Sequence, residues 1–167
     1  MSQSGGTITV DSEPGVGTTF RLFLPRAATS ATTTVVGSSD PEDVQGHGKS
    51  VLVVEDVALL RRVVVRQLDE LGYRPLEAES VAAALALLER QPVDILFTDV
   101  IVGGGATGFD LARIVASRWP ATCVLFTSGF PQARLNAGGG PPPGARILNK
   151  PYRKDDLARA LVEAQRR

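Results

Sequence analysis

Two kinds of hydrophobic pattern divide the chain, and the first is a two-residue alternation near the N-terminus. In residues 7–25, Ile8 and Val10 alternate with threonines, and a second alternating stretch follows the turn sequence EPGVG. This pattern predicts a β-hairpin, which we assign to a first segment of residues 1–25. Because an isolated hairpin is only marginally stable in water, we expect these strands to be the edge of a larger domain.

Residues 26–49 show no hydrophobic periodicity. They are rich in Ser, Thr, Gly and Asp, and they contain His47, the only histidine of the chain. This composition predicts a flexible linker. A solvated histidine in a linker is a poor candidate for a catalytic group, so we assign it no role.

From Ser50 onward, apolar runs alternate with stretches of helical period. The run VLVVED at 51–56 stays apolar until its end, which is typical of a strand buried on both faces. The predicted strands are residues 51–56, 74–79, 95–100, 123–129 and 145–150, and the predicted helices are residues 60–71, 81–91, 109–119, 131–137 and 154–165. Residues 50–167 are therefore predicted to form an α/β fold with a doubly wound, five-stranded parallel sheet of flavodoxin-like order 2-1-3-4-5. The stretch NAGGGPPPG at 136–144 excludes a helix and predicts a mobile loop.

The charge balance narrows the possible partners. The chain has 18 basic and 18 acidic residues, so its formal net charge of zero gives no electrostatic attraction to nucleic acid or to an acidic membrane. No apolar run approaches the roughly 20 residues that a membrane span needs. The N-terminus also lacks the basic and apolar regions of a secretory signal. We therefore expect a cytoplasmic protein without a nucleic-acid partner or membrane contact.

Gly103, Gly105 and Gly108 spell the G-x-G-x-x-G pattern of dinucleotide-binding sites. Such a site needs a carboxylate about 20 residues further on to hold the ribose. The first acidic residue after Asp110 is Asp155, which is much too far along the chain. We therefore interpret these glycines as parts of a loop and not as a nucleotide site.

Five reactive side chains follow the ends of the predicted strands. Glu55 and Asp56 end the first strand and Asp99 the third, while Thr127 ends the fourth and Lys150 the fifth. The functional site of an open α/β sheet lies beyond the carboxyl ends of its strands. These five groups are therefore expected to converge at one edge of the sheet.

The chemistry of this set favours phosphoryl transfer. Three carboxylates close together repel one another unless they bind a cation, and oxygen ligands without His or Cys suit Mg²⁺. Asp99 is then the candidate nucleophile, which would form an acyl phosphate. Lys150 offers a second positive charge, and Thr127 offers a hydroxyl donor to a phosphoryl oxygen.

The sequences VVED, FTDV, LFTSG and NKPY stand in this order at the ends of four predicted strands. In this order and at these spacings they resemble the receiver (response-regulator) domain of two-component signalling, and the resemblance covers residues 50–167. It implies that Asp99 is the phosphoacceptor, that Thr127 is the switch hydroxyl, and that Lys150 precedes Pro151 in the Lys-Pro pair of the family, usually with a cis bond. It also implies a partner, the dimerisation or phosphotransfer domain of a histidine kinase carrying a phosphohistidine.

The same resemblance implies a required Mg²⁺ ion. By this likeness Glu55 and Asp56 form the acidic metal site together with Asp99. The backbone carbonyl of Ile101 is implied as a further ligand.

The N-terminal stretch GGTITVDSEPGVGTTFRLFLP resembles the C-terminal end of a histidine-kinase ATP-binding domain, whose last glycine-rich motif matches GVGTTF. The chain is therefore similar to the tail of a hybrid histidine kinase, in which a linker joins the kinase domain to a receiver. The rest of the ATP site and a helix with a phosphorylatable histidine are missing from the sequence. We accordingly expect no kinase activity from it, and at most phosphorylation and dephosphorylation of Asp99.

The sequence departs from the family pattern near the site. Val102 and Gly103 stand where receivers usually have Met-Pro, and Ile147 stands where an aromatic residue often reports phosphorylation. Two alternatives stay open, a degenerate receiver that binds partners without phosphorylation and a metal-dependent aspartyl-phosphate phosphohydrolase. Retention of all five site residues argues against the first. Ile101 argues against the second, because it stands where such hydrolases have an acid/base Asp and it cannot shuttle a proton.

Overall fold

The computed structural model describes residues 6–25, 45–103, 105–129 and 140–166. The chain divides into two compact units, Met1–Ser38 and Ser39–Arg167. The short helix predicted at 131–137 lies outside the described residues, and so does most of the loop predicted at 136–144. In the part of the chain that is described, no helix is long and apolar enough to cross a lipid bilayer.

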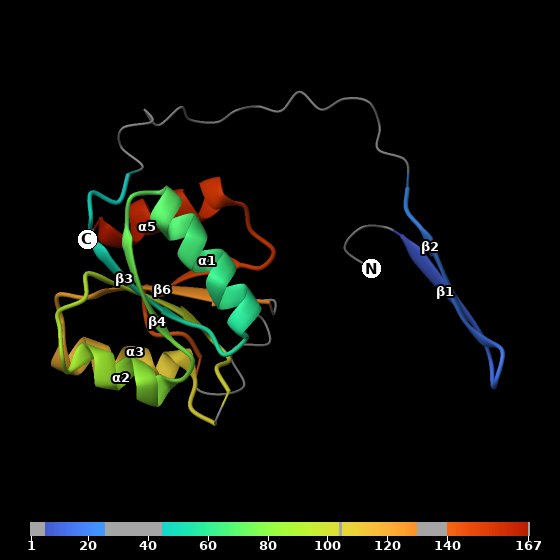
Figure 1. The fold of residues 1–167 in the computed structure, drawn as a ribbon, viewed down its shortest axis with the longest axis horizontal. Coiled ribbons are helices and arrows are strands. Elements are labelled where there is room, and N and C mark those ends of the chain that lie inside the picture. The colour runs from blue at the N-terminus through green and yellow to red at the C-terminus, as the bar shows by residue number, and fades with distance from the viewer. Residues whose placement is uncertain (1–5, 26–44, 104, 130–139, 167) are drawn as a thin grey trace. The chain divides into compact units, whose positions relative to one another are not determined.

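The first unit contains a β-hairpin, which confirms the prediction (Figure 1). Its strands β1 (Thr7–Glu13) and β2 (Gly17–Phe23) pair antiparallel, with Val10 opposite Phe20. The apolar side chains of one face are exposed, with fractions of 46% for Ile8, 52% for Val10, 60% for Phe20 and 58% for Leu22. A two-stranded sheet with one bare apolar face has little stability of its own.

The second unit is a three-layer α/β domain. Its strands are β3 (Ser50–Val54), β4 (Arg74–Ala78), β5 (Ile95–Asp99), β6 (Cys123–Ser128) and β7 (Arg146–Asn149), and its described helices are α1 (Ala58–Glu70), α2 (Val81–Leu88), α3 (Gly108–Arg118) and α5 (Lys154–Gln165). All five strands are parallel, in the order β4-β3-β5-β6-β7. This is the predicted 2-1-3-4-5 order.

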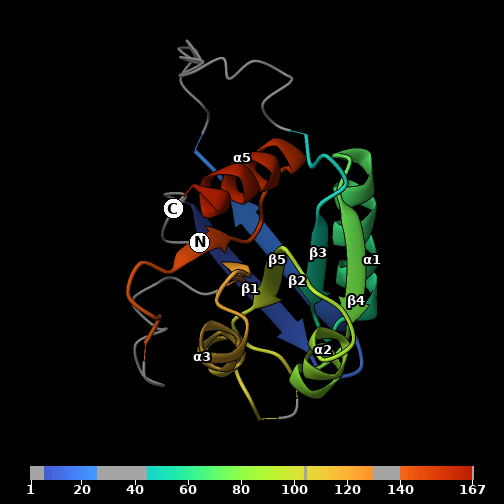
Figure 2. The same ribbon diagram turned by 90° about the vertical axis from the view of Figure 1, so that its left-hand side faces the viewer.

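Helices cover both faces of the sheet, α1 and α5 on one side and α2 and α3 on the other (Figures 1 and 2). Alternate residues of β3 therefore enter two different cores. Val51 and Val53 join the core under α1 and α5, and Leu52 and Val54 join the core over α2 and α3. Burial of both faces explains why β3 is a continuous apolar run and not an alternating one.

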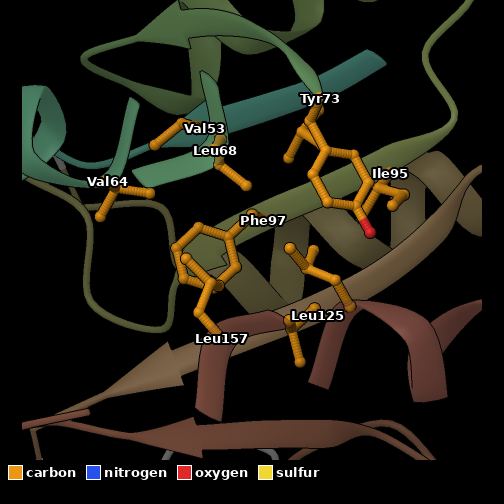
Figure 3. Packing of buried hydrophobic residues seen from close by; sticks show 10 residues of the cluster. Val53, Val64, Leu68, Tyr73, Ile95, Phe97, Leu125 and Leu157 are labelled. Atoms are coloured by element: carbon orange, nitrogen blue, oxygen red, sulfur yellow. The ribbon is translucent and has the colours of Figure 1, made fainter. Parts of the chain in front are cut away.

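Phe97 lies at the centre of the core under α1 and α5 (Figure 3). Its ring is surrounded by apolar side chains from the sheet and from both helices, including Val53, Val64, Leu68, Leu125 and Leu157. Because Phe97 precedes Asp99 by two residues on β5, this packing fixes the strand that carries the candidate nucleophile.

Side-chain caps set the starts of two helices. Ser80 accepts a hydrogen bond from Ala83 N at 3.2 Å, so it caps α2 as the sequence predicts. The next predicted helix begins one residue earlier than expected, at Gly108. There Thr107 and Asp110 form a reciprocal capping box that fixes the start of α3 beside the end of β5.

Residues 45–49, the last part of the range assigned to the linker, are attached to the α/β domain. Gly46 N donates to Leu71 O and Gly48 N donates to Gly72 O, both at 2.8 Å. Gly46 lies so close to the ring of Tyr73 that a Cβ atom on it would be 2.4 Å from the ring. Only glycine fits this contact.

Candidate functional site

The five groups predicted at the strand ends converge at one edge of the sheet. Asp99 is the last residue of β5 and is paired with Thr127 on β6. Glu55 and Asp56 directly follow β3, and Lys150 directly follows β7. The parallel register of neighbouring strands places these positions side by side, as the sequence predicts.

Lys150 joins two of the carboxylates. Its Nζ donates to Glu55 Oε2 and to Asp99 Oδ2, at 2.7 Å in each case. The side chains are 22% exposed for Lys150, 5% for Glu55 and 16% for Asp99, so water screens these ion pairs only weakly. Burial disfavours the ammonium charge, but the hydrogen bonds with Asp99 and Glu55 outweigh it, and the pKa of Lys150 is raised. The lysine therefore stays charged between the two acids.

Backbone groups hold the remaining oxygens of these acids. Val57 N donates to Glu55 Oε1 at 3.2 Å, and Ile101 N donates to Asp99 Oδ1 at 3.3 Å. Arg61, which sequence reasoning missed, donates to the carbonyl of Glu55 at 2.6 Å and so fixes the turn between β3 and α1. Its position one turn into α1 is the only signal in the sequence, and it is too weak to assign a role.

Thr127 carries an unsatisfied donor. The residue is 2% exposed, and its Oγ1 is one of the buried side-chain atoms of the described residues that have no hydrogen-bond partner. A buried hydroxyl without a partner is costly, typically by about 1–3 kcal/mol. The cost is removed when an oxygen-rich group enters the site and accepts its hydrogen bond.

The oxygen atoms near Asp99 fit a hard divalent cation such as Mg²⁺. Asp56 is exposed, and a Cβ atom on Gly103 would be 3.0 Å from Asp56 Oδ2, so this carboxylate lies against the loop that follows Asp99. No three acidic, His or Cys side chains of the described residues form a ready metal cage. Mg²⁺ needs only one or two carboxylates because it keeps several water ligands. Glu55, Asp56, Asp99 and the Ile101 carbonyl would hold it. Both oxygens of Glu55 and both oxygens of Asp99 accept hydrogen bonds, and each carboxylate oxygen keeps a second lone pair for a metal ion.

Comparison with known proteins shows the family of the α/β domain. Residues 51–162 match the family of response regulator receiver domains. The chain belongs to this family. The receiver protein CpdR of Brucella abortus (strain 2308) is 30% identical over 113 residues, which cover 68% of this chain and 93% of CpdR.

Hybrid sensor kinases match a longer part of the chain. The sensor kinase CckA of Brucella abortus is 32% identical over 172 residues, which cover 98% of this chain and 18% of CckA. The sensor histidine kinase AruS of Pseudomonas aeruginosa is 32% identical over 167 residues, which cover 95% of this chain and 16% of AruS. The chain thus spans less than a fifth of these kinases, and its hairpin segment is matched in them as well as its receiver.

Solved receiver structures share the fold. A response regulator receiver protein from Sinorhizobium medicae has a TM-score of 0.63 with 23% identity, covering 71% of this chain and 94% of that one. A receiver domain protein from Clostridium thermocellum has a TM-score of 0.61 with 23% identity, covering 70% of this chain and 94% of that one. The cis peptide bond between Lys150 and Pro151 agrees with the bond that the family resemblance implies.

Two glycines of the receiver's G-x-G-x-x-G stretch, Gly105 and Gly108, have structural roles. Gly105 has φ +90°, a conformation that favours glycine. A Cβ atom on Gly108 would lie 2.2 Å from the carbonyl oxygen of Asp99, so the start of α3 rests directly on the end of β5. Glycine is needed here for a close approach of two backbones.

We predict that Gly108→Ala separates α3 from β5. The added Cβ meets a backbone oxygen that cannot turn away, so we expect a loss of about 1–3 kcal/mol in the free energy of unfolding from the forced backbone shift. Urea unfolding followed by circular dichroism measures it. Ala116→Gly, on an exposed position of the same helix, should cost no more than about 1 kcal/mol. A Gly108→Ala protein as stable as wild type would contradict the packing role.

Proposed function

We propose that this receiver accepts a phosphoryl group on Asp99 from a phosphohistidine, within a hybrid sensor histidine kinase. The observation that carries the proposal is the set of donors around Asp99. Lys150 already donates to Asp99 Oδ2, and the buried Thr127 hydroxyl has no partner among the described residues. Both donors suit the oxygens of an incoming phosphoryl group.

In the reaction an oxygen of the Asp99 carboxylate attacks phosphorus in line with the bond to the histidine nitrogen. The O–P bond forms while the P–N bond breaks, and the electron pair of that bond remains on the imidazole, which is protonated by solvent. Charge on the transferred phosphoryl oxygens is stabilised by the Lys150 ammonium and by the Thr127 hydroxyl. Ile101 is 54% exposed beside the acceptor and offers no proton-transfer group, so rapid hydrolysis as in a phosphohydrolase has no support.

Mg²⁺ belongs to the proposal as the required cofactor. When bound by Glu55, Asp56, Asp99 and the Ile101 carbonyl, it would neutralise negative charge on the acceptor and on the phosphoryl oxygens. Glu55 would also hold Lys150 in place, since it accepts a hydrogen bond from that ammonium group.

The proposed domain organisation follows the sensor kinases. Residues 1–25 would be the end of a kinase ATP-binding domain, residues 26–49 the linker, whose last residues 45–49 are attached to the receiver, and residues 50–167 the receiver. The bare apolar face of the hairpin supports this, since a larger domain would cover it. We propose a cytoplasmic location, where the ATP that charges a histidine kinase is available.

The donor would dock on α1 and the loop at residues 150–152. Four apolar side chains near the start of α1 are exposed, with fractions of 48% for Val57, 70% for Leu59, 43% for Leu60 and 49% for Val63. Between α1 and the loop lies a mainly apolar hollow of about 370 Å³, which Lys150 and Glu55 also line. An apolar surface that borders the acceptor site suits the helix of a phosphotransfer domain, which presents its histidine from an apolar helical face.

We predict that Val63→Glu separates docking from chemistry. A charge on this apolar surface should slow transfer from a phosphohistidine donor about 10-fold or more, since burying an unpaired charge is costly. Phosphorylation by acetyl phosphate, which needs no docking, should proceed at the wild-type rate. Both rates are measured with radiolabelled or mass-resolved phosphoprotein.

Val16→Glu is the matched control, because it makes the same change at a position that is 77% exposed in the hairpin turn. It should leave both rates unaltered. Equal rates for wild type and Val63→Glu with the protein donor would contradict docking on α1. Loss of the acetyl phosphate reaction as well would mean that the substitution acts on the acceptor site and not on docking.

A further inference from the structure

Asp56 differs from the other two carboxylates of the site in how its side chain is held. Glu55 and Asp99 each accept one hydrogen bond from Lys150 and another from a backbone N–H group. Asp56 is exposed, and its carboxylate forms no hydrogen bond or ion pair with the other described residues. The position of this carboxylate therefore depends on van der Waals contact.

Gly103 supplies such a contact. A Cβ atom on Gly103 would lie 3.0 Å from Asp56 Oδ2 and 3.6 Å from Asp56 Cβ, and the first of these distances is closer than ordinary van der Waals contact. Gly103 does not have a positive φ, unlike Gly105, so its backbone conformation does not require glycine. The missing side chain provides space for the Asp56 carboxylate.

The loop that carries Gly103 is anchored on both sides of the contact. Val102 is 3% exposed and packs in the core over α2 and α3. An isolated antiparallel β-bridge joins Ile101 to Thr107 and closes the loop. A side chain at position 103 would therefore displace the exposed Asp56 carboxylate, which no hydrogen bond to a described residue holds, and not the anchored loop.

We propose that Gly103 is a positioning residue for the metal ligand Asp56, an inference that rests on the proposed Mg²⁺ site. A Cβ atom at position 103 would force Asp56 to move by a few tenths of an ångström. Mg²⁺ demands near-ideal octahedral geometry, so a shift of that size in one ligand weakens its binding. A proline also has a Cβ atom and could not approach Asp56 this closely. The glycine that replaces the proline of the family pattern thus has a role of its own.

Binding of Mn²⁺ to the full chain, followed by the loss of the EPR signal of the free ion, tests this role. Mn²⁺ prefers octahedral oxygen ligands, as Mg²⁺ does. We expect the Kd of Gly103→Ala to be about 10-fold or more above that of wild type, the usual loss when a residue that orients a metal ligand is changed. The free energy of unfolding without metal should change by less than about 1 kcal/mol, since alanine fits the backbone at this position.

Gly129→Ala is the matched control. It adds the same methyl group at the same edge of the sheet, directly after β6. Its φ is not positive, and apart from its chain neighbours no described residue has an atom within 4 Å of the new Cβ position. The Kd of this variant should equal the wild-type value. A Gly103→Ala protein that also binds Mn²⁺ like wild type would overturn the proposal and leave the metal site in place.

An Asp56→Asn background shows whether Gly103 acts through Asp56. Asp56→Asn should itself weaken Mn²⁺ binding, and Gly103→Ala added to it should change the Kd by about 2-fold at most, because the two changes affect the same ligand. A further loss of about 10-fold in this background would overturn the proposal, since the alanine would then act on another part of the site. A folded wild-type protein that binds no Mn²⁺ would overturn the proposed Mg²⁺ site and this inference together.

Discussion

Replacing Lys150 by methionine should lower the rate of Asp99 phosphorylation by acetyl phosphate by about 100-fold or more, the usual loss when one preorganised electrostatic donor is removed. The ammonium donates to Asp99 and Glu55 at 2.7 Å, and it is the cation nearest to where the phosphoryl oxygens would arrive among the described residues. Without the ammonium group, the carboxylates of Glu55 and Asp99 have no positive charge between them, and water screens their repulsion only weakly. Initial rates measured by intact mass give the effect directly.

Lys154→Met is the control for that substitution. Lys154 forms an exposed ion pair with Glu70 at 3.0 Å, away from the strand ends, so its loss should leave the phosphorylation rate unaltered. If Lys150→Met reacts within a factor of a few of wild type while folding normally, the lysine does not stabilise the transferred group. Lys150 would then have no catalytic part in the phosphorylation of Asp99.

Phe97→Ala should have the largest effect on stability, a loss of about 3–5 kcal/mol in the free energy of unfolding. The side chain is 1% exposed and is enclosed by the sheet, α1 and α5 (Figure 3). Its removal leaves a cavity that the surrounding strands cannot close. Urea unfolding of the α/β domain, followed by circular dichroism, measures the loss.

Phe20→Ala is the matched control, since Phe20 is 60% exposed on the hairpin. It should leave the unfolding transition of the α/β domain within about 0.5 kcal/mol of wild type. A loss below about 2 kcal/mol for Phe97→Ala would fall under the usual range for core truncation. It would show that the core around β5 is looser than its burial implies.

Much of the fold was predictable because burial leaves a trace in the sequence. A strand buried on both faces is continuously apolar, as in 51–54, and the strand order follows from short right-handed connections. The convergence of Asp99, Thr127 and Lys150 was predictable as well, because each one lies at or next to the carboxyl end of a strand.

Contacts between side chains and distant backbone left no such trace. The bond from Arg61 to the Glu55 carbonyl and the fit of Gly46 against Tyr73 depend on rotamers and on how two elements meet. Gly108 was assigned to a loop with no role because its neighbour, the Asp99 carbonyl, is known only from the structure. Lys150 pairs with both Glu55 and Asp99, an arrangement that the spacing of these residues along the chain does not reveal.

The most direct test of the central claim is the intact mass of the full chain after incubation with acetyl phosphate, with and without Mg²⁺, beside an Asp99→Ala variant. We predict one phosphoryl adduct on the wild-type protein that requires Mg²⁺ and is removed by hydroxylamine, as an acyl phosphate is, and none on the variant. An equal adduct on Asp99→Ala would contradict Asp99 as the acceptor. A folded wild-type protein without any adduct would instead favour a receiver that binds partners without being phosphorylated.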